Sequence, residues 1–142
     1  MQAVLLDTSL ILDCAKRKID VFAGLDGLME GVWEAHVSVG VMREMRKKAL
    51  VKGRAGAEAR LALAMLDARR GKDEAGTATR EGAAGTCVVV EQDEGNVDGW
   101  LLARGKALSA VVCTNDAEVR RKAREAGLKV ISVLHNSRLG YA

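Results

Sequence analysis

The chain has 142 residues, of which 49% are hydrophobic and 29% charged, and its net charge at pH 7 is +3. This size and balance predict one globular domain, residues 1–142, with enough apolar side chains for a core. Aromatic residues make up only 3% of the chain and proline is absent. The core must therefore consist of small aliphatic side chains, which favours helices packed on a sheet. The net charge is too small to identify a nucleic-acid partner by itself.

The cysteines and the first residues bear on where the protein works. Cys14, Cys87 and Cys113 are odd in number, far apart and each within an apolar run, so we interpret them as reduced core thiols. No apolar run approaches the ~20 residues of a membrane helix. The first residues, MQAVLLD, lack the basic start and long apolar stretch of a signal peptide. We therefore expect a cytoplasmic protein with no membrane segment.

Short apolar or β-branched runs alternate with longer segments that have helical spacing. In the first half, this pattern predicts strands at residues 2–6 and 35–39, and helices at 8–18, 20–31, 40–52 and 55–71. Residues 71–86 mix Gly, Ala, Thr and charge without periodicity, which is typical of a loop.

The second half predicts strands at residues 87–91, 110–114 and 129–134, with helices at 96–108 and 116–127. Strands that are apolar along their whole length and alternate with helices indicate a parallel sheet covered on both faces. The expected fold is a three-layer α/β/α sandwich with a central parallel sheet. Ligands of such sheets gather outside the carboxyl ends of the strands.

Acidic residues follow several of these strands. Asp7 ends the first strand and Asp116 follows the strand at 110–114, while Glu44 and Asp98 lie early in two helices. Asp is a favoured N-cap residue, and acids in a first turn favour the helix dipole, so capping is one interpretation. If the acids instead converge on one cleft, their repulsion requires a cation. Carboxylates without His or Cys suit Mg²⁺ or Mn²⁺ rather than zinc.

The order and local motifs of the chain resemble those of the PIN-domain ribonucleases. The resemblance spans nearly the whole sequence and runs through four segments: LLDTSLIL, VSVGVMREM, NVDGWLLARG and VVCTNDAEVRRKAREAGLKVISV. Within that family, the chain looks most like archaeal-type PIN proteins related to small-subunit ribosomal RNA processing nucleases. Toxins of toxin–antitoxin pairs are a close second resemblance.

The resemblance implies a divalent-metal-dependent endoribonuclease that hydrolyses RNA phosphodiester bonds, with Mg²⁺ or Mn²⁺ as cofactor and a role in rRNA processing or ribosome maturation. Carried over by position, the catalytic and metal-binding residues are Asp7, Glu44, Asp98 and Asp116. Thr114 and Ser9 match positions that orient carboxylates or water. The family commonly has a further acid beyond the last Asp, for which Glu118 is the nearest candidate because Val119 is apolar.

Basic residues must flank an acidic cleft that accepts RNA. The predicted RNA-binding residues lie in the helix that carries Glu44, and they are Arg43, Arg46, Lys47 and Lys48, with Lys52 and Arg54 beyond them. A solvated helix face is an equally good interpretation of any one of them. Basic residues in EVRRKARE fit local pairs with Glu118 and Glu125. Trp33 and Trp100 fit core packing, and His36 and His135 show no ligand pattern.

Other functions and partners stay open. A ribonuclease toxin would imply an antitoxin-like protein partner, and a non-catalytic RNA-binding assembly subunit would keep the fold with its acids as helix caps. A flavodoxin-like or receiver-like domain also places acids at strand ends, but it leaves Asp98 and Glu44 without a role. A homodimer is expected from the family and from apolar residues of the second helix and after it, which are Leu25, Leu28, Met29 and Trp33.

Overall fold

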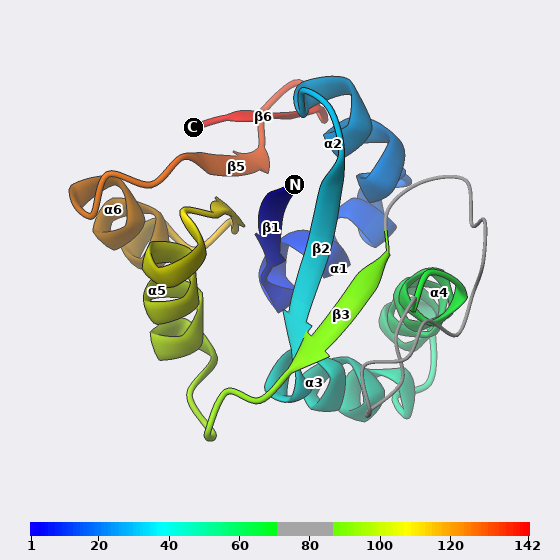
Figure 1. Ribbon diagram of the computed structural model, residues 1–142. Coiled ribbons are helices and arrows are strands. Elements are labelled where there is room, and N and C mark those ends of the chain that lie inside the picture. The colour runs from blue at the N-terminus through cyan, green and yellow to red at the C-terminus, as the bar shows by residue number, and fades with distance from the viewer. Residues whose placement is uncertain (71–86) are drawn as a thin grey trace.

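The structure, a computed structural model, describes residues 1–70 and 87–142. A sheet with strand order β3-β2-β1-β4-β5-β6 forms its centre (Figure 1). The strands are β1 (Gln2–Leu6), β2 (Trp33–Ser38), β3 (Val88–Glu91), β4 (Val111–Cys113), β5 (Val130–Val133) and β6 (Leu139–Tyr141). Strands β1 to β5 pair in parallel, and β6 pairs antiparallel with β5. The predicted loop at residues 71–86 lies outside the described residues.

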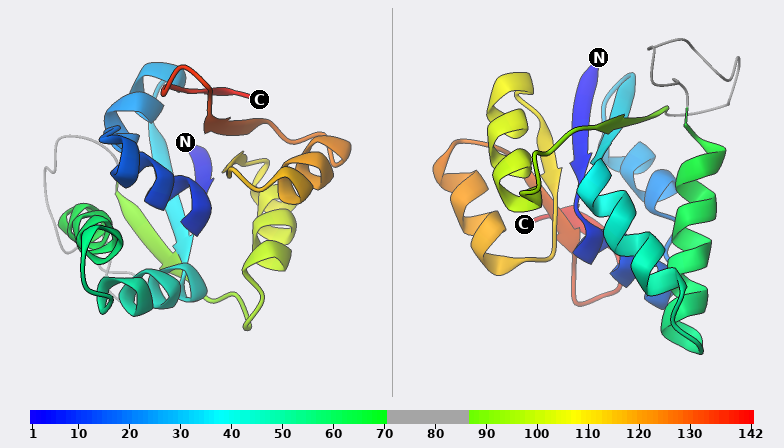
Figure 2. Two further views of the ribbon diagram at one scale, coloured as in Figure 1. Left: turned by 180° about the vertical axis from the view of Figure 1, so that it is seen from behind. Right: turned by 90° about the horizontal axis from the view of Figure 1, so that it is seen from below.

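Helices cover both faces of the sheet. They are α1 (Thr8–Arg17), α2 (Val21–Leu28), α3 (Val39–Ala49), α4 (Arg54–Ala68), α5 (Val97–Leu108) and α6 (Ala117–Glu125). Seen along the sheet, α5 and α6 lie on one side, and α1 to α4 lie on the other (Figure 2). The predicted three-layer α/β/α arrangement is therefore confirmed.

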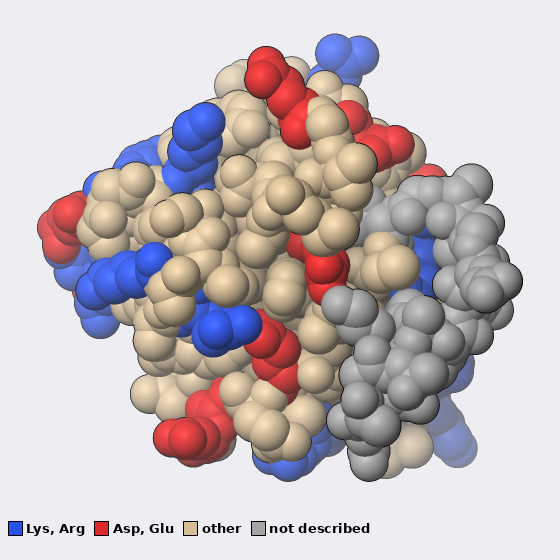
Figure 3. Space-filling view, in the orientation of Figure 1, with Lys and Arg blue, Asp and Glu red and all other residues tan. Residues whose placement is uncertain are grey.

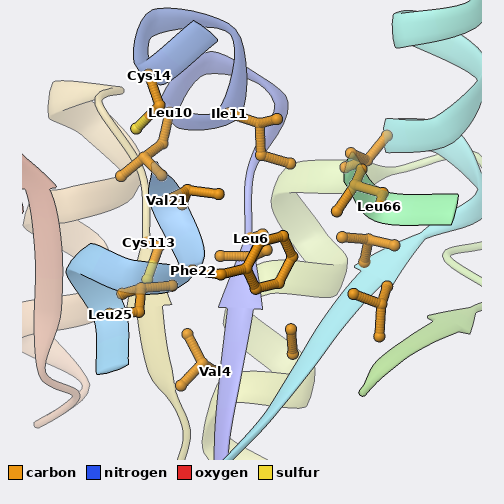
Figure 4. Packing of buried hydrophobic residues seen from close by; sticks show 14 of the residues in the cluster. Val4, Leu6, Leu10, Ile11, Cys14, Val21, Phe22, Leu25, Leu66 and Cys113 are labelled. Atoms are coloured by element: carbon orange, nitrogen blue, oxygen red, sulfur yellow. The ribbon is translucent and has the colours of Figure 1, made fainter. Parts of the chain in front are cut away.

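Each face of the sheet has its own apolar cluster, because successive side chains of a strand point to opposite faces. Val4 and Leu6 of β1 pack with α1 to α4, whereas Leu5 packs with α5 and α6. Figure 4 shows Val4 and Leu6 of β1 together with Phe22 and Leu25 of α2 in the larger cluster. The side chains are mostly aliphatic, as the composition predicts.

Strand β6 is the main departure from the expected fold. We expected the strand at 129–134 to be the last and the sheet to be wholly parallel, but the chain turns back after Leu134 and pairs again with β5. The amide of Leu134 donates to the carbonyl of Arg138, and the amide of Ser137 donates to the carbonyl of Leu134. A three-residue strand of Leu, Gly and Tyr is too short to show a periodicity in the sequence.

The apolar residues that suggested a homodimer are mostly not exposed. Leu25 and Trp33 are 0% and 4% exposed, and Leu28 and Met29 are partly buried against the same core cluster. The argument for a dimer from these residues is therefore wrong, because their side chains pack in or against the larger core cluster.

The cysteines and tryptophans agree with their predicted interpretation as core residues. Cys14 and Cys113 are buried, Cys87 is half-buried, and all three are free thiols. Trp33 and Trp100 are also buried. Within the described residues, no helix is long and apolar enough to cross a membrane.

Candidate active site

A row of buried polar side chains crosses the carboxyl ends of four neighbouring strands. Leu5 pairs with His36, Leu6 with Cys113, and Cys113 with Ile131. Continued past these pairs, the register sets Asp7 opposite Ser38 on one side and Thr114 on the other, and Thr114 opposite Ser132. Ser38, Asp7, Thr114 and Ser132 therefore form one row. These side chains are between 0% and 7% exposed. Polar groups buried at this edge of a parallel sheet mark the place where such folds bind ligands.

Asp7 is the centre of this row. One carboxylate oxygen, Oδ2, accepts hydrogen bonds from the hydroxyl of Thr114 at 2.7 Å and from the hydroxyl of Ser9 at 3.1 Å. Thr114 Oγ1 in turn accepts from the amide of Asp116, and Ser9 Oγ accepts from the amide of Asn115. The two hydroxyls thus hold Asp7 against the loop that follows β4. Asp7 precedes α1, but its side chain makes no capping hydrogen bond.

The charge of Asp7 is poorly compensated. Burial raises the pKa of Asp7, the hydrogen bonds from Thr114 and Ser9 lower it, and repulsion from the nearby charge of Asp98 raises it further. The net direction is upward, so the ionised carboxylate is less stable here than in water. The donors to Asp7 are the hydroxyls of Thr114 and Ser9 and the backbone amide of Thr8, all of them neutral. A cation would stabilise this carboxylate more than they do.

Asp98 belongs to α5, on the side of the sheet opposite α1 (Figure 2). It lies in the first turn of α5, and the cap of that helix is Asn96, whose side-chain oxygen accepts from the amide of Gly99. Asp98 is therefore not needed as a cap, as the sequence predicts. Its charge contributes to the raised pKa of Asp7, so the two carboxylates lie within electrostatic range of each other.

Asp116 has a structural role in addition to any chemical one. Its Oδ1 accepts from the amides of Glu118 and Val119 at 2.9 and 3.0 Å, which caps α6. The sequence left capping open for both strand-end acids. The structure shows capping by Asp116 and not by Asp7.

Asn115 closes the loop between Thr114 and Asp116. Its side-chain nitrogen donates to Asp13 of α1 at 2.8 Å, and its side-chain oxygen accepts from the amide of Val133 in β5 at 3.0 Å. The loop is therefore fixed to a helix and to a neighbouring strand. This fixes the direction in which Asp116 leaves the sheet.

Glu44 lies on α3 and is exposed, and the described contacts do not tie it to the other acids. Within the described part of the chain, no three His, Cys, Asp or Glu side chains stand close enough together to enclose a metal ion. Mg²⁺ commonly binds through only one or two carboxylates and keeps several waters. The pair of Asp7 and Asp98 fits that chemistry, because both offer hard oxygen ligands and their charges repel. The buried hydroxyl of Thr8, beside Asp7, also has no hydrogen-bond partner among the described residues.

The basic residues predicted to bind RNA are all exposed on α3, and they are Arg43, Arg46, Lys47 and Lys48. On α6, Arg121 instead pairs with Glu118 and Glu125, as expected from the spacing. Glu118 is thus held in local ion pairs. Figure 3 shows acidic side chains in a band across one face, with basic side chains over α5 and α6 and at the lower margin near α3.

Sequence reasoning missed the residues that support this edge, above all Asp93. Asp93 lies just after β3 and is 7% exposed. It follows a strand, as Asp7 does, so the same rule could have found it. Ser38 and Ser132 also went unnoticed, because serine is common in turns and loops. A serine near the end of a strand therefore does not indicate a site.

The comparisons with known proteins are structural. No family model and no curated protein sequence matches the chain. The PIN-domain endonuclease Utp24 is similar over 98% of this chain and 90% of its own, with a TM-score of 0.67 and 24% identity. VapBC-1 from nontypeable Haemophilus influenzae is similar over 91% and 96%, with a TM-score of 0.55 and 14% identity. Both likenesses span the sheet and its helices, and the chain therefore has the PIN-domain fold.

Proposed function

We propose that the protein is a divalent-metal-dependent endoribonuclease that hydrolyses phosphodiester bonds of RNA. The observation that carries this proposal is the state of Asp7. It is a buried carboxylate with a raised pKa, it is repelled by the charge of Asp98, and its donors are neutral. A purely structural acid would be placed where donors or cations satisfy it. The PIN-domain fold, shared with an endonuclease, supports the same conclusion.

The residues have distinct roles in this proposal. Asp7, Asp98 and Asp116 would hold Mg²⁺ or Mn²⁺, and Glu44 would complete the site as a ligand or as the base that takes a proton from water. When bound, such a cation supplies an activated water and neutralises the charge that develops on the phosphate. Thr114 and Ser9 keep the Asp7 carboxylate in one orientation through their hydrogen bonds.

RNA would reach the acids across the basic side of α3. Arg43, Arg46, Lys47 and Lys48 are exposed on the helix that carries Glu44. Lys and Arg bind the phosphate backbone and offset the repulsion between RNA and the acids. The binding should therefore weaken steeply with salt, because each phosphate contact releases counterions.

Ribosomal RNA processing is the role we favour, because the sequence looks most like PIN proteins related to small-subunit rRNA processing nucleases. The structural likeness to the endonuclease Utp24 is also greater, in TM-score and identity, than the likeness to VapBC-1. A toxin would instead be inhibited by an antitoxin-like partner. Cleavage of a structured rRNA fragment in preference to an unstructured RNA of the same length would support the first role. Equal cleavage of both would favour a less selective ribonuclease.

The test combines Mn²⁺ titration by calorimetry with cleavage of a structured RNA, in wild type and Asp7→Asn. Asp20→Asn is the matched control, because it makes the same change at the cap of α2, where Asn caps about as well as Asp. We expect Asp7→Asn to lose Mn²⁺ binding and cleavage together, and Asp20→Asn to keep both. A wild-type protein that binds no Mn²⁺ would contradict the nuclease and favour the assembly-subunit alternative.

A further inference from the structure

Asp93 is a second buried carboxylate at the carboxyl edge of the sheet, in the connection from β3 to α5. Its Oδ1 accepts from the amide of Gly95 at 2.9 Å, and its Oδ2 accepts from the amide of Gly40 at 2.8 Å. The hydroxyl of Ser38, at the end of β2, is also a hydrogen-bond partner. One side chain thus joins its own loop to the start of α3.

The electrostatic state of Asp93 is the opposite of that of Asp7. Burial acts to raise the pKa of Asp93, but hydrogen bonds from Ser38 and from two glycine amides, together with the charge of Arg43, outweigh it and lower the pKa. Its oxygens are already used by donors within the protein. Asp93 is therefore suited to holding elements together and not to binding an ion.

The space around this contact is tight. A Cβ on Gly40 would lie 2.3 Å from Oδ2 of Asp93 and 2.8 Å from a methyl carbon of Val97. The amide of Asn96, which caps α5, donates to the carbonyl of Asp93 at 3.1 Å. The starts of α3 and α5 therefore meet at Asp93, and a side chain larger than Gly at position 40 would push them apart.

Both helices carry acids of the proposed site. Glu44 follows Gly40 by four residues, about one helical turn, and Asp98 is the second residue of α5. We propose that Asp93 is a positioning residue of the nuclease: its bridge between α3 and α5 sets the place of Glu44 relative to Asp98. This inference rests on the function proposed above. Partners that orient metal ligands typically change metal affinity or activity by 10- to 100-fold when removed.

The experiment breaks the bridge from both sides. Asp93→Ala removes the acceptor, and Gly40→Ala leaves the acid in place but pushes against it. Asp93→Asn keeps one acceptor oxygen and should fall between wild type and Asp93→Ala. Glu94→Gln is the matched control, because Glu94 is the next residue and is exposed. Val130→Ala, at the start of β5 in the smaller core cluster, controls for loss of stability alone.

The measurements are the Mn²⁺ dissociation constant by calorimetry, and kcat and KM for a structured RNA. We expect Asp93→Ala and Gly40→Ala to weaken Mn²⁺ binding about 10-fold and to lower kcat 10- to 100-fold, with KM unchanged. The double variant should be little worse than either single one, because both changes break the same contact. Glu94→Gln and Val130→Ala should bind Mn²⁺ as wild type does.

Two results would overturn the positioning role while leaving the nuclease intact. One is wild-type Mn²⁺ affinity and kcat in Asp93→Ala. The other is the same loss in Val130→Ala at an equal drop in melting temperature, which would mean that stability alone matters. A wild-type protein without Mn²⁺ binding or cleavage would overturn the nuclease and the positioning role together.

Discussion

Replacing Asp7 by Asn should stabilise the metal-free protein, although it removes the proposed function. Burial and repulsion by Asp98 raise the pKa of Asp7 in spite of its hydrogen bonds. The ionised carboxylate therefore lowers the free energy of unfolding at neutral pH. Asn is nearly isosteric and neutral, and its oxygen can still accept from the hydroxyls of Thr114 and Ser9.

The expected gain is about 1 kcal/mol, the usual size of a stabilising substitution. For a chain of this length, it raises the melting temperature by about 3 °C. Because the pKa of Asp7 is raised on folding, the gain should vanish below the unfolded pKa of about 3.9. It should then grow as the pH rises through the folded pKa, and stay constant above it.

Metal should reverse the order of the two proteins. An ion present at 100 times its dissociation constant stabilises the folded state by about 2.7 kcal/mol, or about 8 °C on the same scale. Melting curves in EDTA and in saturating Mn²⁺, followed by circular dichroism, test both halves of the prediction for wild type and Asp7→Asn. The reasoning is refuted if Asp7→Asn melts below wild type in EDTA, or if Mn²⁺ raises both melting temperatures equally.

Substitutions at two positions test the support of the site, and a labelling experiment tests the core. Thr114→Val removes the buried hydroxyl that donates to Asp7. It should lower the free energy of unfolding, measured in urea, by about 1–3 kcal/mol, and it should weaken Mn²⁺ binding. Thr114→Ser keeps the hydroxyl and should leave both quantities near wild type. Asn115→Ala breaks the side-chain contacts of its loop with α1 and β5 and should lower stability by about 1–2 kcal/mol, with Mn²⁺ affinity reduced less than in Asp7→Asn. Ellman's reagent at pH 8 should label Cys87 before Cys14 and Cys113, because the latter two thiols are buried and burial raises their pKa. Rapid labelling of all three thiols would contradict the described core.

Much of the fold follows from the sequence because its strands are apolar and its helices are periodic. The placing of Asp7 beside Thr114 depends on the pairing of β1 with β4. From the sequence alone this pairing had to be assumed, and the structure confirms it. Boundaries differ by a few residues, as for β2, expected at 35–39 and found at Trp33–Ser38. The missed β6 has three residues and is set by a turn, so local pattern carries little information about it.

The site was less predictable than the fold. Sequence position identifies acids near strand ends, but it does not tell which oxygen points inward or which donor meets it. Asp116 caps α6, whereas Asp7 at an equivalent place does not cap α1. The difference arises from Thr114 and Ser9, which draw the Asp7 carboxylate toward the loop after β4. The contact with Thr114 joins residues 107 positions apart, and local spacing cannot encode it.

The two buried aspartates at this edge, Asp7 and Asp93, differ in their electrostatic environment, and this difference fits the different roles that we propose for them. Asp93 has donors on both oxygens and a lowered pKa, so its charge stabilises the fold and a cation would gain little there. Asp7 has neutral donors, a like charge nearby and a raised pKa, so its charge destabilises the fold until something positive binds. A fold that needed only caps and bridges would satisfy both acids alike. A cation bound at Asp7 would recover this free energy, which supports our proposal that Asp7 takes part in the chemistry and that Asp93 positions the helices around it.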